Sequence, residues 1–140
     1  MIWKSKIDLE ELNRSYKNTM VGHLSILLTE VGDDFLRGTM PVVDFTKQPY
    51  GIMHGGASAS LAESVGSIAA NYTVDREKKF AVGLDLNTSH LKMARDGLVT
   101  ATAKPLHLGG TVQVWQIQIH NEQDELVSFS RLTMAVLDRR

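Results

Sequence analysis

The segment from residue 55 to residue 70 constrains the fold more than any other part of this sequence. Twelve of its sixteen residues are Gly, Ala or Ser. The segment reads as a helix over about 55–72, although each glycine costs a helix about 1 kcal/mol relative to alanine. Tiny side chains allow a sheet or a ligand to lie almost against the helix backbone. We therefore predict a buried helix at the centre of the fold rather than a surface helix.

Strand patterns surround this helix on both sides. A short helix is predicted to begin after Asp8, which can act as its N-cap. Six strands are predicted, over residues 24–31, 34–43, 79–92, 97–106, 111–120 and 125–137. Because the last four are joined by short connections, we expect them to be antiparallel neighbours in chain order. An antiparallel sheet can cover a single helix only if it curls around it, so we predict an α+β fold.

Composition limits the class of protein. The 140 residues, 43% of them apolar, fit one domain spanning 1–140 with a substantial core. A net charge of −1 argues against a nucleic-acid partner and leaves self-association open. The absence of cysteine excludes disulfides, a thiolate nucleophile and Cys-ligated zinc, and it suits a reducing cytoplasm. The N-terminus lacks the apolar region of a signal peptide, and no apolar stretch is long enough to span a membrane, so neither export nor insertion is predicted.

Glu63 is the most unusual residue of the predicted helix. No other charged residue occurs between Gly55 and Val74. Because a buried carboxylate is costly unless it is paired or reaches a polar cavity, Glu63 is predicted to serve a site rather than a solvated face. Ser67 lies one turn further along the same face, where it can hold a water molecule or steady the carboxylate.

The tripeptide His54-Gly55-Gly56 precedes Glu63 at the start of the same helix. The first backbone N–H groups of a helix have no intrahelical partner and lie at the positive end of its dipole. Since no side chain covers them at the two glycines, a substrate carbonyl oxygen can approach, as an oxyanion hole requires. His54 by itself fits an ordinary loop histidine equally well.

The sequence contains no motif for metal, nucleotide or serine-nucleophile chemistry. The five histidines form neither HxH nor HxxxH pairs, so no metal site is predicted. The GxxxxGK[ST], GxGxxG and GxSxG patterns are all absent, which argues against nucleotide cofactors and a serine nucleophile. We predict no cofactor.

The segment QPYGIMHGGASASLAESVGS, residues 48–67, resembles the signature of the hotdog-fold acyl-CoA thioesterases. In that family a Gln precedes His-Gly-Gly, and a helical Glu follows eight residues after the first Gly. Gln48, His54, Gly55 and Glu63 stand at those positions. The segments MIWK, GDD, NxxH, KPLHLG and QVWQI extend the resemblance along the chain, toward the subfamily that hydrolyses 1,4-dihydroxy-2-naphthoyl-CoA in menaquinone synthesis and its relatives that proofread enterobactin assembly.

The resemblance implies a hotdog fold, in which a curled antiparallel sheet wraps around one long central helix. It implies a homodimer joined through the strand near 79–92, commonly doubled into a homotetramer. Glu63 would be the nucleophile or general base, and the Gly55 N–H would be the oxyanion donor. Gln48 and His54 would position the thioester, and Ser67 would assist the attacking water. The site would straddle the dimer interface, with Glu63 facing His54 of the partner subunit.

The resemblance also implies substrate-binding positions. Ile68 would border the acyl group. Coenzyme A would contact a larger set, namely Gly83, His90, Leu91, Lys92, Met93, His107, Leu108, Gly109, Gly110, Thr111 and Val112.

The leading interpretation is hydrolysis of an aromatic acyl-CoA, and three alternatives stay open. One is a proofreading thioesterase that acts on a misacylated aryl-carrier protein. Another is a hydroxyacyl-thioester dehydratase, which the Gln48 spacing and the Gly-Gly after His54 disfavour. The last is a noncatalytic acyl-CoA-binding module, which would not need the Glu63 carboxylate.

Overall fold

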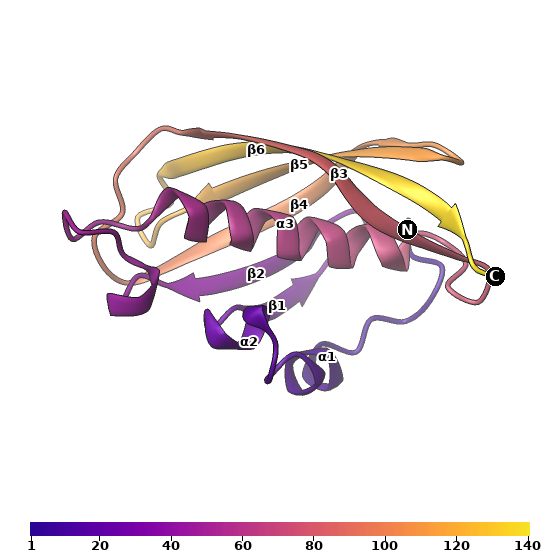
Figure 1. Cartoon of the computed structure of the whole chain (residues 1–140), viewed down its shortest axis with the longest axis horizontal. Helices are drawn as coiled ribbons and strands as arrows, with labels where there is room; N and C mark the ends of the chain where they lie inside the picture. Colours follow the sequence, from indigo (N-terminus) through magenta and orange to yellow (C-terminus); the bar gives the residue numbers. More distant parts are fainter.

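The computed structural model describes residues 1–140 as a six-stranded antiparallel sheet curled around one long helix (Figure 1). The central helix is α3, Gly55–Tyr72. The strands are β1 Leu27–Val31, β2 Leu36–Pro41, β3 Lys79–His90, β4 Leu98–Leu108, β5 Val112–His120 and β6 Leu126–Asp138. Three short helices complete the fold, α1 Leu9–Ser15, α2 Met20–His23 and the 3-10 helix η1 Asp44–Thr46. The predicted fold class is confirmed.

Helix α3 has the predicted bounds and the predicted close packing. Its side chains Leu61 and Val65 are fully buried against the sheet. A Cβ atom added at Gly66 would stand 2.7 Å from Leu132 Cδ2 on β6, closer than side-chain atoms pack. Gly66 therefore carries no side chain because β6 occupies that space, which accounts for a glycine in the middle of the helix.

The order of the strands differs from the predicted meander. The sheet runs β1-β2-β4-β5-β6-β3, so β4, β5 and β6 are neighbours as predicted, whereas β3 pairs with β6 and not with β4. The reason is that β3 ends at His90 and β4 begins at Leu98, leaving residues 91–97 to cross the end of the sheet. That connection is held by Leu91 N–H, which donates to Val127 O (2.8 Å), and by Ala94 O, which accepts from Met53 N–H (2.8 Å).

The N-terminal region holds an element that the sequence patterns do not predict. Asp8 caps α1 as expected, accepting from Glu11 N–H at 3.1 Å. Helix α2 then occupies residues 20–23, so β1 begins at Leu27 rather than at residue 24. The turn between α1 and α2 is fixed by Tyr16 O, which accepts from Thr19 N–H (3.0 Å), Thr19 Oγ1 (2.6 Å) and Gly22 N–H (3.2 Å). Helices α1 and α2 lie beside β1 in Figure 1.

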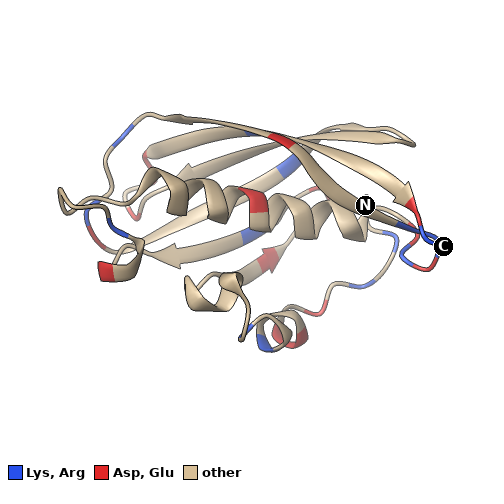
Figure 2. Cartoon of the chain, viewed as in Figure 1, with Lys and Arg blue, Asp and Glu red and all other residues tan.

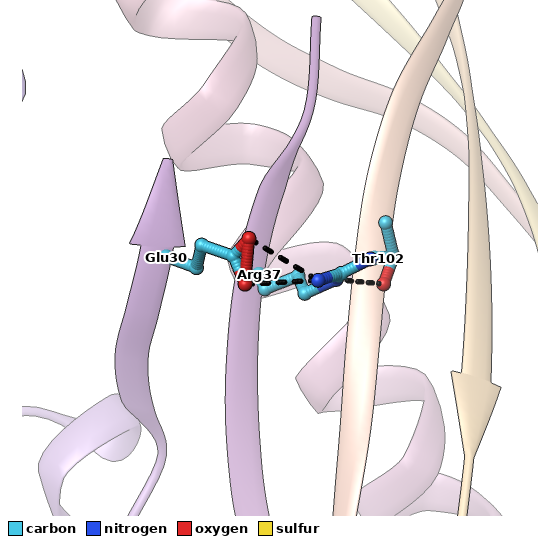
Figure 3. Close-up of polar contacts among 3 residues, drawn as sticks. All are labelled: Glu30, Arg37 and Thr102. Carbon is cyan, nitrogen blue, oxygen red and sulfur yellow. Dashed lines mark hydrogen bonds and ion pairs between the residues drawn. The ribbon is translucent and has the colours of Figure 1, made fainter. Parts of the chain in front are cut away.

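The outer face of the sheet is polar. Arg37 on β2 donates from Nη1 to Glu30 Oε1 on β1 (2.9 Å) and from Nε to Thr102 Oγ1 on β4 (3.1 Å), as Figure 3 shows. Because the ion pair is solvent-exposed, it stabilises the fold by roughly 0–1 kcal/mol and mainly ties three strands together. None of the helices has the length and apolar character needed to cross a lipid bilayer.

Candidate active site

Glu63 lies on an exposed face of α3, which corrects the expectation that this helix is buried all round. The sheet covers one side of the helix, where nine residues are buried. On the other side Ser60, Ser64, Ser67 and Ile68 are only partly covered. Glu63 is the single charged residue of α3 and gives the red band on this helix in Figure 2. In a single chain the Glu63 carboxylate is therefore accessible to solvent and does not need a buried partner.

A groove of about 390 Å³ runs along this exposed face. Helix α3 forms one wall, and the α1–α2 region forms the other. The lining residues are Tyr16, Met20, Val21, Ser60, Glu63, Ser64, Ser67 and Ile68. We call this space the Glu63 groove. It brings together three of the predicted site residues, Glu63, Ser67 and Ile68.

Gly83 on β3 borders the carboxylate of Glu63. A Cβ atom added at Gly83 would lie 2.6 Å from Glu63 Oε2. The missing side chain at position 83 therefore makes room for the Glu63 carboxylate against the strand. Gly83, expected to contact coenzyme A, stands beside the acidic group.

A second cavity, of about 370 Å³, lies at the N-terminus of α3. We call it the Gly55 cavity; its lining residues are Gln48, Ile52, Met53, Gly55, Ser58, His90, Leu91, Lys92, Met93, Ala94 and Val127. The Gly55 N–H donates to no group of the chain, whereas the Gly56 N–H donates to His54 Nδ1 at 2.8 Å. The Gly55 amide is thus a free donor at the positive end of the helix dipole, as an oxyanion hole requires.

His54 and Gln48 hold different positions around this helix start. His54 is exposed and caps α3 through Nδ1, which places the proton of the neutral imidazole on Nε2 and leaves that N–H as a donor. Gln48 lines the Gly55 cavity, and its side-chain oxygen accepts from the Tyr50 backbone N–H. The Gln48 amide NH₂ is left as a second donor at the cavity.

The Gly55 cavity and the Glu63 groove are separate within one chain. Gly55 and Glu63 are eight positions apart on the helix, which corresponds to about 12 Å along the axis. Reacting atoms must approach to roughly 3–3.5 Å. A carbonyl bound at the Gly55 N–H is therefore beyond direct attack by Glu63 of the same helix.

Strand β3 forms an edge of the sheet next to these features. It is twelve residues long and pairs only with β6. Val82 is 37% exposed, and Leu84, at a break in the β3–β6 register, is 62% exposed. A long edge with free backbone groups and exposed apolar side chains is suited to pairing with another strand.

The predicted coenzyme A contacts divide into two sets. The segment from His90 to Met93 lines the Gly55 cavity, where Lys92 Nζ pairs with Glu125 Oε2 at 3.2 Å. A hydrogen bond from Asn121, together with Lys92, lowers the pKa of the Glu125 carboxyl.

The second set, from His107 to Val112, forms the β4–β5 hairpin at the other end of the sheet. Val112 lies level with Ala135 and, through it, with Val82 on β3. Val82 is eight residues from His90, about 26 Å along the strand. One chain does not bring the two sets together.

Several residues that the sequence patterns did not predict line the Glu63 groove and the Gly55 cavity. The wall of the Glu63 groove opposite α3 is lined by Tyr16, Met20 and Val21 from the α1–α2 region. Ser58 lines the Gly55 cavity and shares a hydrogen bond with Ser128, at 3.2 Å between hydroxyl oxygens. No motif or spacing in the sequence links these residues to the Gly55 and Glu63 positions.

Comparison with known proteins identifies the family. The family model described as "Thioesterase superfamily" matches residues 50–128, which hold Gly55 and Glu63. The chain belongs to the thioesterase superfamily. It is a thioester hydrolase with a hotdog fold, and the family expected from residues 48–67 is confirmed.

Named relatives and solved structures cover nearly the whole chain. The 1,4-dihydroxy-2-naphthoyl-CoA hydrolase of Escherichia coli is 52% identical over 98% of this chain and 100% of its own. The proofreading thioesterase EntH of Cronobacter sakazakii is 46% identical over 98% of this chain and 99% of its own. A thioesterase structure from Haemophilus influenzae has a TM-score of 0.96 at 46% identity, covering 99% of this chain and 96% of its own.

Proposed function

We propose that this thioesterase hydrolyses aromatic acyl-CoA thioesters, with 1,4-dihydroxy-2-naphthoyl-CoA as the leading substrate. The observation that carries the proposal is the free Gly55 N–H at the start of α3, in a cavity that also holds the Gln48 amide. Two donors at one point suit a carbonyl oxygen that gains negative charge during attack. The acyl group is proposed from the 52% identity to the hydrolase of Escherichia coli that carries this substrate in its name. A cytoplasmic location fits the cysteine-free chain.

The proposed active site is completed by a second copy of the chain. The 12 Å separation of Gly55 and Glu63 along one helix leaves each chain with two incomplete halves. Pairing of two β3 edges would bring Glu63 of one chain toward His54 and Gly55 of the other. The exposed Val82 and Leu84 on this edge support such pairing, and two of these dimers would form a homotetramer.

The proposed chemistry follows from the charges at the two halves. The thioester carbonyl oxygen accepts from the Gly55 N–H and the Gln48 amide, which polarises the carbonyl carbon. Glu63 then either attacks that carbon and forms an anhydride, or removes a proton from a water molecule that attacks it, with Ser67 orienting the water. In both routes the carbon–sulfur bond breaks, and the thiolate of coenzyme A leaves and takes up a proton. In the first route water then hydrolyses the anhydride, which releases the carboxylic acid and restores the Glu63 carboxylate; in the second route the carboxylic acid is released directly.

An acyl group carried on an aryl-carrier protein is the second candidate substrate. It is favoured by the 46% identity to the proofreading thioesterase of Cronobacter sakazakii. A panel of aryl-, short-chain and long-chain acyl-CoA thioesters, together with benzoylated carrier protein, distinguishes the candidates by kcat/KM. We expect the aryl-CoA thioesters to be hydrolysed fastest.

A mixing experiment tests the two-chain site. His54→Ala removes the imidazole proposed to position the thioester, and Glu63→Ala removes the carboxylate, so each variant should be nearly inactive toward benzoyl-CoA. After subunit exchange, hybrid dimers carry one intact site, so free-thiol release should recover to a fraction of the wild-type rate. If exchange is verified with tagged subunits and no activity returns, the site lies within one chain and this arrangement is wrong.

A further inference from the structure

The wall of the Glu63 groove opposite α3 contains a phenol that the proposed mechanism does not use. Tyr16 follows α1 and lines the groove together with Glu63, Ser67 and Ile68. Its ring is half-buried and packs against the core. Its hydroxyl makes no hydrogen bond with any group of the chain, although it can both donate and accept.

The position of Tyr16 is fixed by its own backbone. Its carbonyl accepts three hydrogen bonds, two from Thr19 and one from Gly22. A Cβ atom added at Gly22 would stand 2.6 Å from that carbonyl, so the turn closes tightly only with glycine there. The turn fixes the backbone that carries the ring, and the ring itself packs against the core, so little conformational freedom is lost when a ligand contacts it.

The Tyr16 hydroxyl is protonated at neutral pH. Its pKa is raised above 10.0, mainly by burial and also by the nearby Tyr72, while Arg76 opposes the shift. Tyr72 follows Ile68 by one helical turn but does not line the Glu63 groove. Because an ordinary tyrosine is already protonated at neutral pH, and burial shifts the pKa of Tyr16 further upward, the hydroxyl is available as a donor.

We propose that Tyr16 is a specificity-determining residue whose hydroxyl binds a ring hydroxyl of an aromatic acyl group. This inference rests on the proposed function, since it takes the Glu63 groove as the acyl site. Ile68 and Met20 provide apolar walls for the ring, and Tyr16 provides a polar contact in the same groove. The groove then selects hydroxylated aryl thioesters over the bare aryl thioester, because a site built around a hydrogen bond rejects a ligand that lacks it.

The test compares selectivity rather than activity alone. We would measure kcat/KM for benzoyl-, 3-hydroxybenzoyl- and 4-hydroxybenzoyl-CoA, and take the ratio of the better hydroxylated thioester to benzoyl-CoA. Tyr16→Phe keeps the ring and removes the hydroxyl, so that ratio should fall about three- to ten-fold. Tyr72→Phe is the matched control, since it removes the neighbouring phenol hydroxyl without altering the lining of the groove. It should leave the ratio unchanged.

The remaining outcomes separate this inference from the proposed function. Wild-type protein that hydrolyses benzoyl-CoA without preferring either hydroxylated thioester would overturn the role of Tyr16 and leave the proposed function intact. An unchanged ratio in Tyr16→Phe, or an equal loss for all three thioesters, would do the same, because a structural role for the ring moves every rate together. Wild-type protein that releases no thiol from any aryl-CoA would instead refute the proposed function.

Discussion

The Gly55 cavity and the Glu63 groove lie on the same helix and differ in chemical character. The cavity offers neutral donors, the Gly55 N–H and the Gln48 amide, and no carboxylate lines it. The groove carries the one carboxylate of α3, with serines beside it. A carboxylate in the first turn would itself accept from the free amide and fill the anion-binding position. The distance between the two regions therefore keeps the donor available for a substrate oxygen.

The largest expected effect removes the charge from the groove. Glu63→Gln preserves shape but can neither attack the thioester nor deprotonate water, so kcat toward benzoyl-CoA should fall at least about a hundred-fold. KM should change far less, and thermal unfolding and sedimentation should match wild type, because Glu63 is exposed. A variant that keeps more than about a tenth of the wild-type kcat would show that the groove does not supply the catalytic group.

Gly83→Ala moves the same carboxylate without removing it. The added methyl would stand 2.6 Å from Glu63 Oε2, so the flexible side chain must shift and kcat should fall about ten-fold or more. Gly110→Ala is the control for kcat, because a Cβ atom there meets nothing within 4 Å and cannot move Glu63, although an expected coenzyme A contact at this position can alter KM. Sedimentation checks that the variant at the β3 edge still associates. Equal activity of the two variants would contradict the fixed position of the carboxylate.

Ile68→Val tests whether the groove, rather than the cavity, holds the acyl group. One methylene in an apolar pocket changes selectivity by about 1–3 kcal/mol, so ratios of kcat/KM within an acyl-CoA panel should shift about five-fold or more. Binding of free coenzyme A as a competitive inhibitor should not change. Identical ratios across the panel would remove position 68 from the acyl site.

Lys92→Ala probes the cavity and should give the smallest effect. Lys92 is half-exposed and paired with Glu125, so a contact with a coenzyme A phosphate would be weak and screened by salt. We expect KM to rise about two- to three-fold at low ionic strength, with kcat unchanged. A fall in kcat with constant KM would assign Lys92 to the chemical step instead.

The sequence predicts local structure here better than it predicts which elements meet. Helix α3 has the predicted bounds because its long run of Gly, Ala and Ser supplies the small side chains that a helix packed closely against a curled sheet requires. The predicted pairing of β3 with β4 is wrong, because local patterns do not reveal that residues 91–97 cross the end of the sheet. Helix α2 is too short for a periodic signal and has no side-chain cap.

The candidate site was predictable in part for the same reason. Gly55 and Glu63 stand out locally, one as part of a Gly-Gly pair and the other as a lone charge. The exposure of Glu63 depends on how far the sheet curls, which the helix sequence does not encode. Tyr16 reaches the groove only through a turn that joins two short helices, so no periodicity points to it.

The pairing of β3 with β6 has a consequence for the order of folding. Lys79 pairs with Asp138 and His90 with Ser128, so β3 finds its only neighbour in the last strand of the chain. During synthesis, α3 and β3 emerge long before that neighbour exists, and closing so long a loop is entropically costly. We expect β3 to dock late, after the β4–β5–β6 hairpins have formed, and the strand proposed to join two subunits to be among the last parts of each subunit to become ordered.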